Sequence, residues 1–151
     1  MELLEGISWS FSQEKYEDFQ SFLKEINERN VEIMEDDNVW NADEIVLQNA
    51  KIDIQYMAWL ESPKDILANE ELCEDDDFWE DEDNSDDGFF QAELLMHLIA
   101  DNGAFFTAGE LLYKIHNQMA NKELGDHVFF EGLQPYESDD DVPSFYLLCG
   151  S

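Results

Sequence analysis

Acidic side chains outnumber basic ones so heavily in this sequence that any fold must form against its own electrostatic repulsion. The 151 residues contain 38 Asp and Glu but only 7 Lys and Arg, which gives a formal net charge of −31 at pH 7. Solubility does not require a charge of this size, and self-repulsion opposes the compact state. We therefore predict that a positively charged partner matches the acidic surface. Nucleic acids and anionic membranes are excluded as direct partners, because both are negatively charged.

The chain nevertheless contains enough apolar residues to build a core. Hydrophobic residues make up 44% of the sequence and aromatic residues 13%, whereas disordered acidic proteins are poor in aromatic residues. A chain of this length is long enough for one domain with a hydrophobic core and short for two. We predict a single domain over residues 1–151.

The N-terminal sequence and the cysteines favour a cytoplasmic protein. The sequence MELLEGISWSF has Glu2 and Glu5 where a signal peptide requires basic residues, and no apolar run approaches the roughly 18 residues of a membrane span. Cys73 and Cys149 are far apart and have no metal-ligand spacing, and Cys149 is one position too late for a prenylation box. Two isolated thiols are typical of a reducing compartment, so we expect a cytoplasmic location.

Hydrophobic periodicity predicts several amphipathic helices. Ser10 and Gln13 have the spacing of a capping box, and the apolar residues that follow predict a helix over 11–29. Residues 88–103 also place apolar side chains on one helical face. A second capping box at Thr107 begins a helical stripe that is predicted to end at Gly125.

Two segments in the middle of the chain are less regular. Residues 41–60 begin with capping-box spacing, which favours a helix, but Ile52, Ile54 and Tyr56 alternate as they would in a strand. The two alternatives stay open, with helix favoured because of the cap. In SPKDILANEEL, Ser62 is placed as an N-cap and Pro63 at the first helical position, so a short helix is predicted.

The last part of the chain changes to strand character. HVFFEGL and SFYLLCG are short and rich in aromatic residues, and they flank the acidic connection QPYESDDDVP. This pattern predicts two antiparallel strands. The predicted fold class is therefore α+β, a single domain in which amphipathic helices come first and pack with a small C-terminal antiparallel sheet.

The densest run of charge is CEDDDFWEDEDNSDD, residues 73–87, which has ten acidic residues and no Lys or Arg. Adjacent like charges oppose a regular helix, so we predict an exposed acidic loop over 70–87. Phe78 and Trp79 lie inside this run, although a solvated loop gains nothing from large apolar groups. They either hold the loop against its own domain or serve as buried anchors in a complex.

No motif in the sequence predicts catalysis, a metal or a cofactor. DNSDDG resembles the start of a calcium loop, but Leu94 occupies the position that requires a bidentate Glu. The histidines, His97, His116 and His127, lack the spacing of a ligand pair, and nucleophile and phosphate-loop motifs are absent. Glu131, between apolar strand residues, is the one candidate for a general acid. We predict that the protein is not an enzyme.

The C-terminal residues resemble a known family. FFTAGELLYKIHNQMANKELGDHVFFEGL, residues 105–133, and PSFYLLCGS, residues 143–151, are similar to immunity proteins of bacterial contact-dependent growth inhibition systems. The most similar branch is that of the ribonuclease toxin immunity proteins, and the most distinctive shared element is LGDHVFFEGL. No functional residue carries over position by position, and the N-terminal hundred residues add nothing to the resemblance.

The resemblance implies a small cytoplasmic protein that binds the C-terminal nuclease domain of a toxin. A ribonuclease presents a basic cleft to RNA phosphates, and a folded polyanion is suited to block it. On this hypothesis, acidic side chains imitate phosphates while Phe78 and Trp79 fix the register. The predicted toxin-binding residues are Glu74, Asp75, Asp76, Asp77, Phe78, Trp79, Glu80, Asp81, Glu82, Asp83, Glu137, Asp139, Asp140 and Asp141.

Two other classes of protein fit the same charge. One is a DNA mimic or anti-restriction protein, which would bind another basic nucleic-acid enzyme and would space its carboxylates as duplex phosphates are spaced. The other is an acidic domain adapted to high salt, which added salt would stabilise strongly and which would bind no basic protein tightly.

Overall fold

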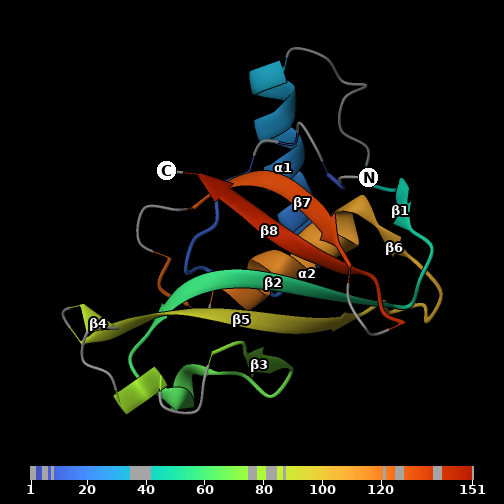
Figure 1. The fold of residues 1–151 in the computed structure, drawn as a ribbon. Coiled ribbons are helices and arrows are strands. Elements are labelled where there is room, and N and C mark those ends of the chain that lie inside the picture. The colour runs from blue at the N-terminus through green and yellow to red at the C-terminus, as the bar shows by residue number, and fades with distance from the viewer. Residues whose placement is uncertain are drawn as a thin grey trace.

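A six-stranded mixed β-sheet forms the centre of the computed structural model, and two α-helices lie on its far side in Figure 1. The structure describes residues 3–4, 7, 9–34, 42–74, 78–80, 85–86, 88–120, 122–124, 128–137 and 141–150, with the backbone alone at 30–34 and 85–86. Along the chain the elements are α1 (Phe19–Met34), β1 (Ile45–Leu47), β2 (Lys51–Leu60), the 3-10 turn η1 (Pro63–Asp65), β3 (Glu70–Leu72), the 3-10 turn η2 (Phe78–Glu80), β4 (Ser85–Asp86), β5 (Phe89–Ile99), β6 (Phe106–Thr107), α2 (Ala108–Met119), β7 (Phe129–Tyr136) and β8 (Ser144–Gly150).

The strand order of the main sheet is β3-β5-β2-β8-β7, and β4 pairs with β5 off this path. The long strands β2 and β5 are antiparallel from Lys51 opposite Ile99 to Leu60 opposite Phe90. β7 and β8 are also antiparallel, with a register shift near Gly132. β2 and β8 are parallel, which joins the two antiparallel pairs into one sheet. β1 and β6 form a separate two-stranded sheet.

The core lies between this sheet and the helices. Its completely buried side chains come from both layers: Phe22 and Ile26 of α1, Ile52 and Ile54 of β2, Leu94 and Met96 of β5, and Leu111, Leu112 and Ile115 of α2. Full burial of one such side chain contributes about 1.5 to 3 kcal/mol. A core of this size explains how the fold tolerates a net charge of −31.

The prediction of a helix over 88–103 is wrong, because these residues form β5. Phe90, Leu94 and Leu98 are spaced by four, and a spacing of four places residues on one face of a strand as well as of a helix. In the structure, burial alternates along β5, with Ala92 and Met96 completing the buried face. The pairing partners β2 and β3 lie far away in the sequence, and they determine the strand.

The ambiguous segment 41–60 is also strand rather than the favoured helix. It forms β1 and the ten-residue strand β2. The alternation of Ile52, Ile54 and Tyr56 was therefore the better signal, since all three side chains are buried on the helix side of the sheet. The capping-box spacing at the start of the segment was misleading, because strands rather than a helix follow it.

The prediction of a helix over 11–29 is correct in type, but the helix starts later. α1 begins at Phe19, where the Asp18 side chain accepts a hydrogen bond from the Gln20 backbone N–H at 3.0 Å. Before it, the chain runs beside β7, because Phe130 N–H donates to Trp9 O and Phe11 N–H donates to Val128 O. Burial of the N-terminal aromatic residues against β7 outweighs the local capping signal.

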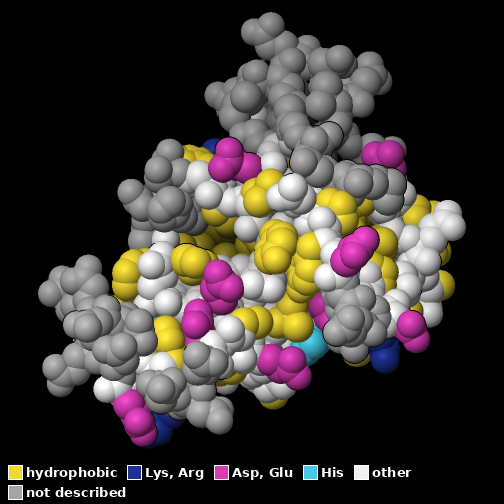
Figure 2. Space-filling model, viewed as in Figure 1, with side chains coloured by type: hydrophobic (Ala, Val, Ile, Leu, Met, Phe, Trp, Pro, Cys, Tyr) yellow, Lys and Arg dark blue, Asp and Glu magenta, His cyan; other side chains and the backbone are white. Residues whose placement is uncertain are grey.

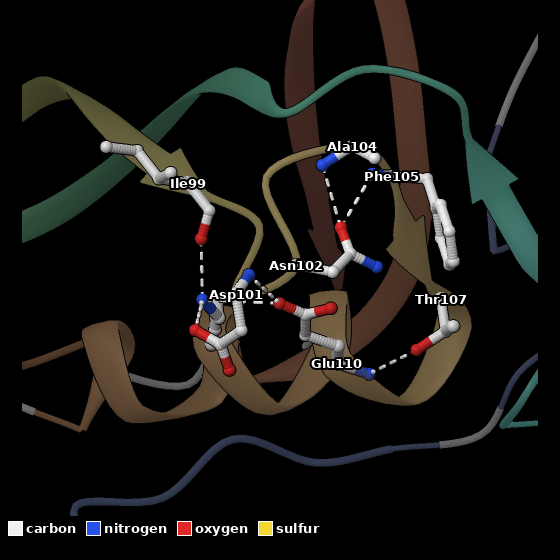
Figure 3. Close-up of polar contacts among 8 residues, drawn as sticks. Ile99, Asp101, Asn102, Ala104, Phe105, Thr107 and Glu110 are labelled. Atoms are coloured by element: carbon white, nitrogen blue, oxygen red, sulfur yellow. Dashed lines mark hydrogen bonds and ion pairs between the residues drawn. The ribbon is translucent and has the colours of Figure 1, made fainter.

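The predicted helix after Thr107 is confirmed. The Thr107 hydroxyl accepts a hydrogen bond from the Glu110 backbone N–H at 3.3 Å and caps α2 (Figure 3). The helix ends at Met119, before the predicted stop at Gly125. Glu110 also accepts a hydrogen bond from the Asp101 backbone N–H at 2.8 Å, which ties the turn after β5 to the helix.

We expect Thr107→Ala to destabilise the fold by about 1 kcal/mol, the usual effect of losing an N-cap. The matched variant Thr107→Ser keeps the hydroxyl and is expected to retain most of the stability. Urea denaturation of both variants provides the measurement. Equal losses for Ala and Ser would mean that the hydroxyl does not cap α2.

The short helix predicted after Ser62 is partly confirmed. Ser62 accepts a hydrogen bond from the Lys64 backbone N–H at 3.2 Å, and Pro63 is the first residue of η1. The turn covers only Pro63–Asp65, and Glu70–Leu72 is the edge strand β3. The segment 70–87, predicted to be an exposed loop, thus includes β3, η2 and β4.

The two predicted C-terminal strands are confirmed as the antiparallel pair β7 and β8. The predicted fold class is nevertheless wrong. The strands are not a small sheet added to a helical protein, because β2 and β5 supply the centre of a six-stranded sheet and only two α-helices are present in the described part of the chain. Among the described residues, none of the helices is both long enough and apolar enough to cross a membrane.

His116 of α2 lies in a buried cage of aromatic rings with both ring nitrogens hydrogen-bonded. Trp9 Nε1–H donates to His116 Nδ1 at 3.1 Å, so His116 Nε2–H donates to the Glu14 carbonyl oxygen at 2.7 Å. Burial lowers the pKa of His116 below its ordinary value of 6.5, and the nearby Glu14 only partly opposes this. The imidazole is therefore neutral in the folded protein.

This geometry predicts a stability that depends on pH. Because the folded-state pKa of His116 is lowered, its contribution is fully present above pH 6.5 and is lost as the pH falls toward the folded-state value. We expect the difference in unfolding free energy between the parent and His116→Gln to shrink as the pH falls from about 7.5 to 5.5. Denaturant titrations at each pH measure it. A difference that stays constant would contradict a neutral His116.

Candidate protein-binding face

The face of the sheet turned away from the helices carries exposed apolar side chains. On β2 and β5 the even-numbered residues, apart from the half-buried Phe90, are buried on the helix side. The odd-numbered residues therefore face the other way, and of these Asp53 is also buried. Met57 is 48% exposed and Tyr146 41% exposed. Figure 2 shows hydrophobic side chains over the middle of this face, with Asp and Glu side chains between and around them. We call this surface the open face and define it by the outward residues of β2, β5, β7 and β8.

Tyr136 and Tyr146 stack on each other across β7 and β8. Their ring centroids are 4.3 Å apart and their planes are inclined by 28°. Beside them, Gln55 Nε2–H donates to Glu93 Oε2 at 2.7 Å, which fixes a carboxylate in the middle of the open face. Aromatic side chains beside oriented carboxylates are suited to contact a protein surface with basic residues.

His97 and Asp53 form an ion pair on the same face. His97 Nδ1 lies 2.7 Å from Asp53 Oδ1, and His97 Nε2 lies 3.6 Å from Glu71 Oε2. Burial alone would lower the pKa of His97, but the hydrogen bond and charge of Asp53, assisted by Glu71, outweigh it and raise the pKa. His97 therefore lies on the strand β5 rather than in the predicted helix, between two carboxylates that favour its protonated form.

This ion pair does not have the arrangement of a hydrolase. Asp53 lies opposite His97 on one side and opposite Ser144 on the other. A serine nucleophile needs the imidazole next to its hydroxyl, with the carboxylate behind the imidazole. Here the carboxylate stands in the middle, and Ser144 donates its hydrogen bond to the Val142 carbonyl oxygen at 3.2 Å. Glu131, the candidate general acid, is exposed rather than set in an apolar pocket.

A cavity of about 230 Å³ opens where β2 and β8 separate. The two strands pair only at Asp53, Ile54 and Gln55, after which both continue without pairing to each other. A hollow is visible in Figure 2 at this place. We call it the fork cavity, and its lining residues are Tyr56, Met57, Ala58, Trp59, Gln91, Met119, Leu124, Leu147 and Cys149.

The lining of the fork cavity is mainly apolar and includes one thiol. Burial, together with the smaller effect of the Glu131 charge, raises the pKa of Cys149 to about 12. The thiol therefore stays protonated at neutral pH and behaves as a small apolar group.

A second hollow with acidic walls adjoins the fork cavity at Trp59. We call it the acidic hollow, and its lining residues are Gln13, Trp59, Leu60, Glu61, Asp65, Phe89 and Glu123. Trp59 lines both spaces. Its backbone N–H donates to the Glu123 carbonyl oxygen at 2.8 Å, so the segment after α2 holds the end of β2 in place.

A buried ion pair lies beneath β2 on the helix side of the sheet. Lys122 Nζ is 3.0 Å from Glu70 Oε1, and both side chains are completely buried. Within the described residues the ammonium group makes this ion pair but no well-aligned hydrogen bond. The other Glu70 oxygen accepts hydrogen bonds from Tyr56 Oη and from Gln118 Nε2, and Leu67 N–H donates to Oε1.

These contacts keep Glu70 ionised. Burial would raise the pKa of Glu70, but the hydrogen bonds from Tyr56, Gln118 and Leu67, together with Lys122, lower it below its ordinary value. Burial is also the main reason that the pKa of Tyr56 is raised, and the charge of Glu70 adds to it. The phenol therefore stays a hydrogen-bond donor. No local pattern predicts this cluster, because Tyr56, Glu70 and Lys122 lie far apart along the chain.

The two aromatic residues of the predicted toxin-binding site pack against their own domain. Phe78 is only 7% exposed, and its ring centroid lies 5.7 Å from that of Phe90 and 5.2 Å from that of Trp79. Trp79 also packs against the core. Of the two alternatives for these aromatic residues, the structure therefore favours the one in which they hold their segment against its own domain.

The acidic members of the predicted site that the structure describes come from two separate parts of the chain. Glu74 Oε1 accepts a hydrogen bond from Glu93 N–H at 3.3 Å, beside β5, and Glu80 is exposed in η2. Glu137 and Asp141 are exposed at the connection between β7 and β8. The remaining predicted residues lie outside the described residues: Asp75, Asp76, Asp77, Asp81, Glu82, Asp83, Asp139 and Asp140.

Sequence reasoning missed the open face and the fork cavity. The one available signal was that Met57 and Trp59, two large apolar residues, occupy outward positions of an alternating strand. His127 lies outside the described residues, as does much of the DNSDDG segment. Among the residues that the structure describes, no group of three His, Cys, Asp or Glu side chains is arranged to hold a metal ion.

Some of the few basic side chains form ion pairs within the chain. Lys114 donates to the Ile99 carbonyl oxygen at 2.6 Å and pairs with Asp101 at 2.8 Å and Glu110 at 3.3 Å (Figure 3). Lys122 pairs with Glu70 in the interior. Both lysines therefore pair with carboxylates of the same chain.

Comparison of the chain with protein-family models, curated proteins and solved structures found no match.

Proposed function

We propose that this chain is a cytoplasmic immunity protein that binds the basic nuclease domain of a contact-dependent growth inhibition toxin and neutralises it without catalysis. The nuclease is a ribonuclease in this proposal, and inhibition is stoichiometric. The acidic surface of the chain covers the cleft through which the enzyme would bind RNA phosphates. No cofactor takes part.

The observation that carries this proposal is a net charge of −31, which the few basic side chains of the chain do not offset. Two of the 7 basic side chains, Lys114 and Lys122, already pair with carboxylates. The surface therefore has an acidic excess that its own cations cannot offset. A cationic partner would relieve the self-repulsion and would be attracted at rates up to about 10⁸ to 10⁹ M⁻¹s⁻¹.

The open face supports binding to a protein rather than mimicry of DNA. A DNA mimic requires rows of carboxylates spaced as phosphates are, whereas the described open face interrupts its carboxylates with Met57 and with the stacked Tyr136 and Tyr146. Exposed aromatic and Met side chains are enriched in protein interfaces. A mixture of apolar anchors and surrounding charge provides both affinity and specificity.

A titration of RNA cleavage tests the proposal. The proposal requires the gene immediately upstream to encode a protein that ends in a basic nuclease domain. That C-terminal domain is mixed with increasing amounts of this chain, and cleavage of a labelled RNA is followed. We expect cleavage to stop at one-to-one stoichiometry. The control is the same titration with a basic ribonuclease from an unrelated source. Equal inhibition of both enzymes would mean that inhibition comes from nonspecific attraction between charges and would contradict specific neutralisation. Full cleavage by the neighbouring enzyme at excess inhibitor would overturn the proposal.

A further inference from the structure

We infer that the fork cavity and the acidic hollow together form the docking site for a basic protein segment in which an apolar side chain neighbours Arg or Lys. The apolar side chain enters the fork cavity, and the cationic side chain lies in the acidic hollow, with Trp59 between them. This inference rests on the proposed function, since the nuclease domain supplies the segment.

The size and lining of the fork cavity favour a single side chain as its occupant. Its volume of about 230 Å³ is below the roughly 300 to 1,000 Å³ that is common for small-molecule sites. Met57, Leu147 and the protonated Cys149 offer no charge to a polar ligand. A Leu, Met or Phe side chain from a partner would find an apolar environment there and would lose its contact with water.

The fork explains why the cavity exists in an otherwise paired sheet. β8 pairs with β7 along its whole length, and β2 pairs with β5 along its whole length. Each inner strand is therefore held by its outer neighbour, so the two can separate after Gln55 and Tyr146 without losing the sheet. The opening is a fixed feature of two well-paired strands, and its position does not require a partner to form.

The acidic hollow determines the charge of the neighbouring side chain. Glu61 and Asp65 are exposed, and they lie with Glu123 around one space. The Asp65 side chain is held in place because it accepts a hydrogen bond from the Glu61 backbone N–H at 2.8 Å. An Arg or Lys in this hollow would be close to carboxylates and to the Trp59 ring, which adds a cation–π contribution.

Charge complementarity therefore identifies the occupant. A neutral apolar peptide would use only the fork cavity, and an acidic one would be repelled by the hollow. A basic partner gains from both spaces, and the chain as a whole attracts it through its net charge of −31. The two hollows share Trp59, so adjacent or nearly adjacent residues of one segment reach both.

Two variants and a matched control test the inference by binding to the neighbouring nuclease domain. Cys149→Phe fills the fork cavity, and we expect it to weaken binding about 30-fold or more, as the loss of a central anchor does. Glu61→Gln/Asp65→Asn/Glu123→Gln neutralises the acidic hollow and is expected to weaken binding about tenfold. Glu17→Gln/Glu25→Gln/Glu28→Gln removes the same charge on and before α1, and we expect less than about threefold weakening.

A thiol measurement keeps the inference testable if a variant folds poorly. In a Cys73→Ser background, Cys149 is the one remaining cysteine of the sequence. We expect the bound nuclease domain to slow the modification of Cys149 by a small methanethiosulfonate reagent at least tenfold. Urea denaturation of each variant shows which losses of binding affinity result from a destabilised fold.

The outcomes separate this inference from the proposed function. If the parent neutralises the nuclease but the hollow triple and the control triple weaken binding equally, and Cys149 stays as reactive as before, the docking site is wrong while the proposed function stands. If the parent does not bind the nuclease, both are overturned. Selective weakening together with protection of Cys149 supports both.

Discussion

Replacing Lys122 by Met is expected to destabilise the protein by about 3 to 5 kcal/mol, because it leaves the buried Glu70 carboxylate without its ion-pair partner. Both side chains are completely buried, with Nζ and Oε1 3.0 Å apart. Tyr56 and Gln118 would still donate to the carboxylate, but neither carries a positive charge. The measurement is urea denaturation at pH 7, followed by tryptophan fluorescence.

The double variant Lys122→Met/Glu70→Gln is the control for this prediction. It removes both charges while Gln keeps an acceptor for Tyr56, so it should be more stable than Lys122→Met alone. The pKa of Glu70 is lowered in the fold, and its contribution is therefore present above its ordinary value of 4.5 and is lost as the pH falls below it. A single variant that is as stable as the double variant would contradict a buried charge pair.

Replacing Phe78 by Ala is expected to destabilise the protein by about 3 kcal/mol, since a well-buried Phe is removed. The ring is 7% exposed and packs against Phe90 and Trp79. In this account the effect appears in the unfolding free energy of the free protein. An interface anchor would behave differently, because its removal would speed dissociation from the partner and leave the free protein stable.

Phe78→Leu is the matched control, because it keeps an apolar side chain in the same place. We expect it to recover more than half of the lost stability, as measured by urea denaturation. A Phe78→Ala variant as stable as the parent, combined with faster release of the nuclease, would restore the interpretation in which the aromatic residues anchor the complex.

The parts of the fold that the sequence predicted correctly are those that depend on local signals. α2 has a capping threonine, an apolar stripe and no competing pattern, and the structure contains it. β7 and β8 are short, aromatic-rich strands close together in the sequence, and they pair as predicted. In each case the residues that determine the element lie within or beside it.

The central strands were mispredicted because their signal depends on residues far away. Phe90, Leu94 and Leu98 satisfy the spacing of a helix and of a strand equally. The segment becomes a strand because it pairs with β2 along its length and with Glu70–Leu72 of β3. These partners lie outside the short stretch of sequence from which a helix was predicted. The helix start at Phe19 has a similar cause, since Trp9 and Phe11 pack beside β7 instead of entering the helix.

The position of the candidate site could not be predicted from the sequence. The excess of acidic residues in the composition is the basis for predicting a basic partner, and that partner stays a prediction. The fork cavity depends on the separation of β2 and β8, which lie far apart in the sequence. Trp59 joins two hollows only because the chain after α2 returns to the end of β2.

We propose that the acidic surface serves to bind a basic protein. The most direct test is calorimetric titration of the chain with the neighbouring nuclease domain at ionic strengths of about 0.02 and 0.5 M. We predict one-to-one binding at low salt and an affinity that falls steeply at high salt. An absence of binding at low salt, or an affinity that salt does not change, would contradict the claim.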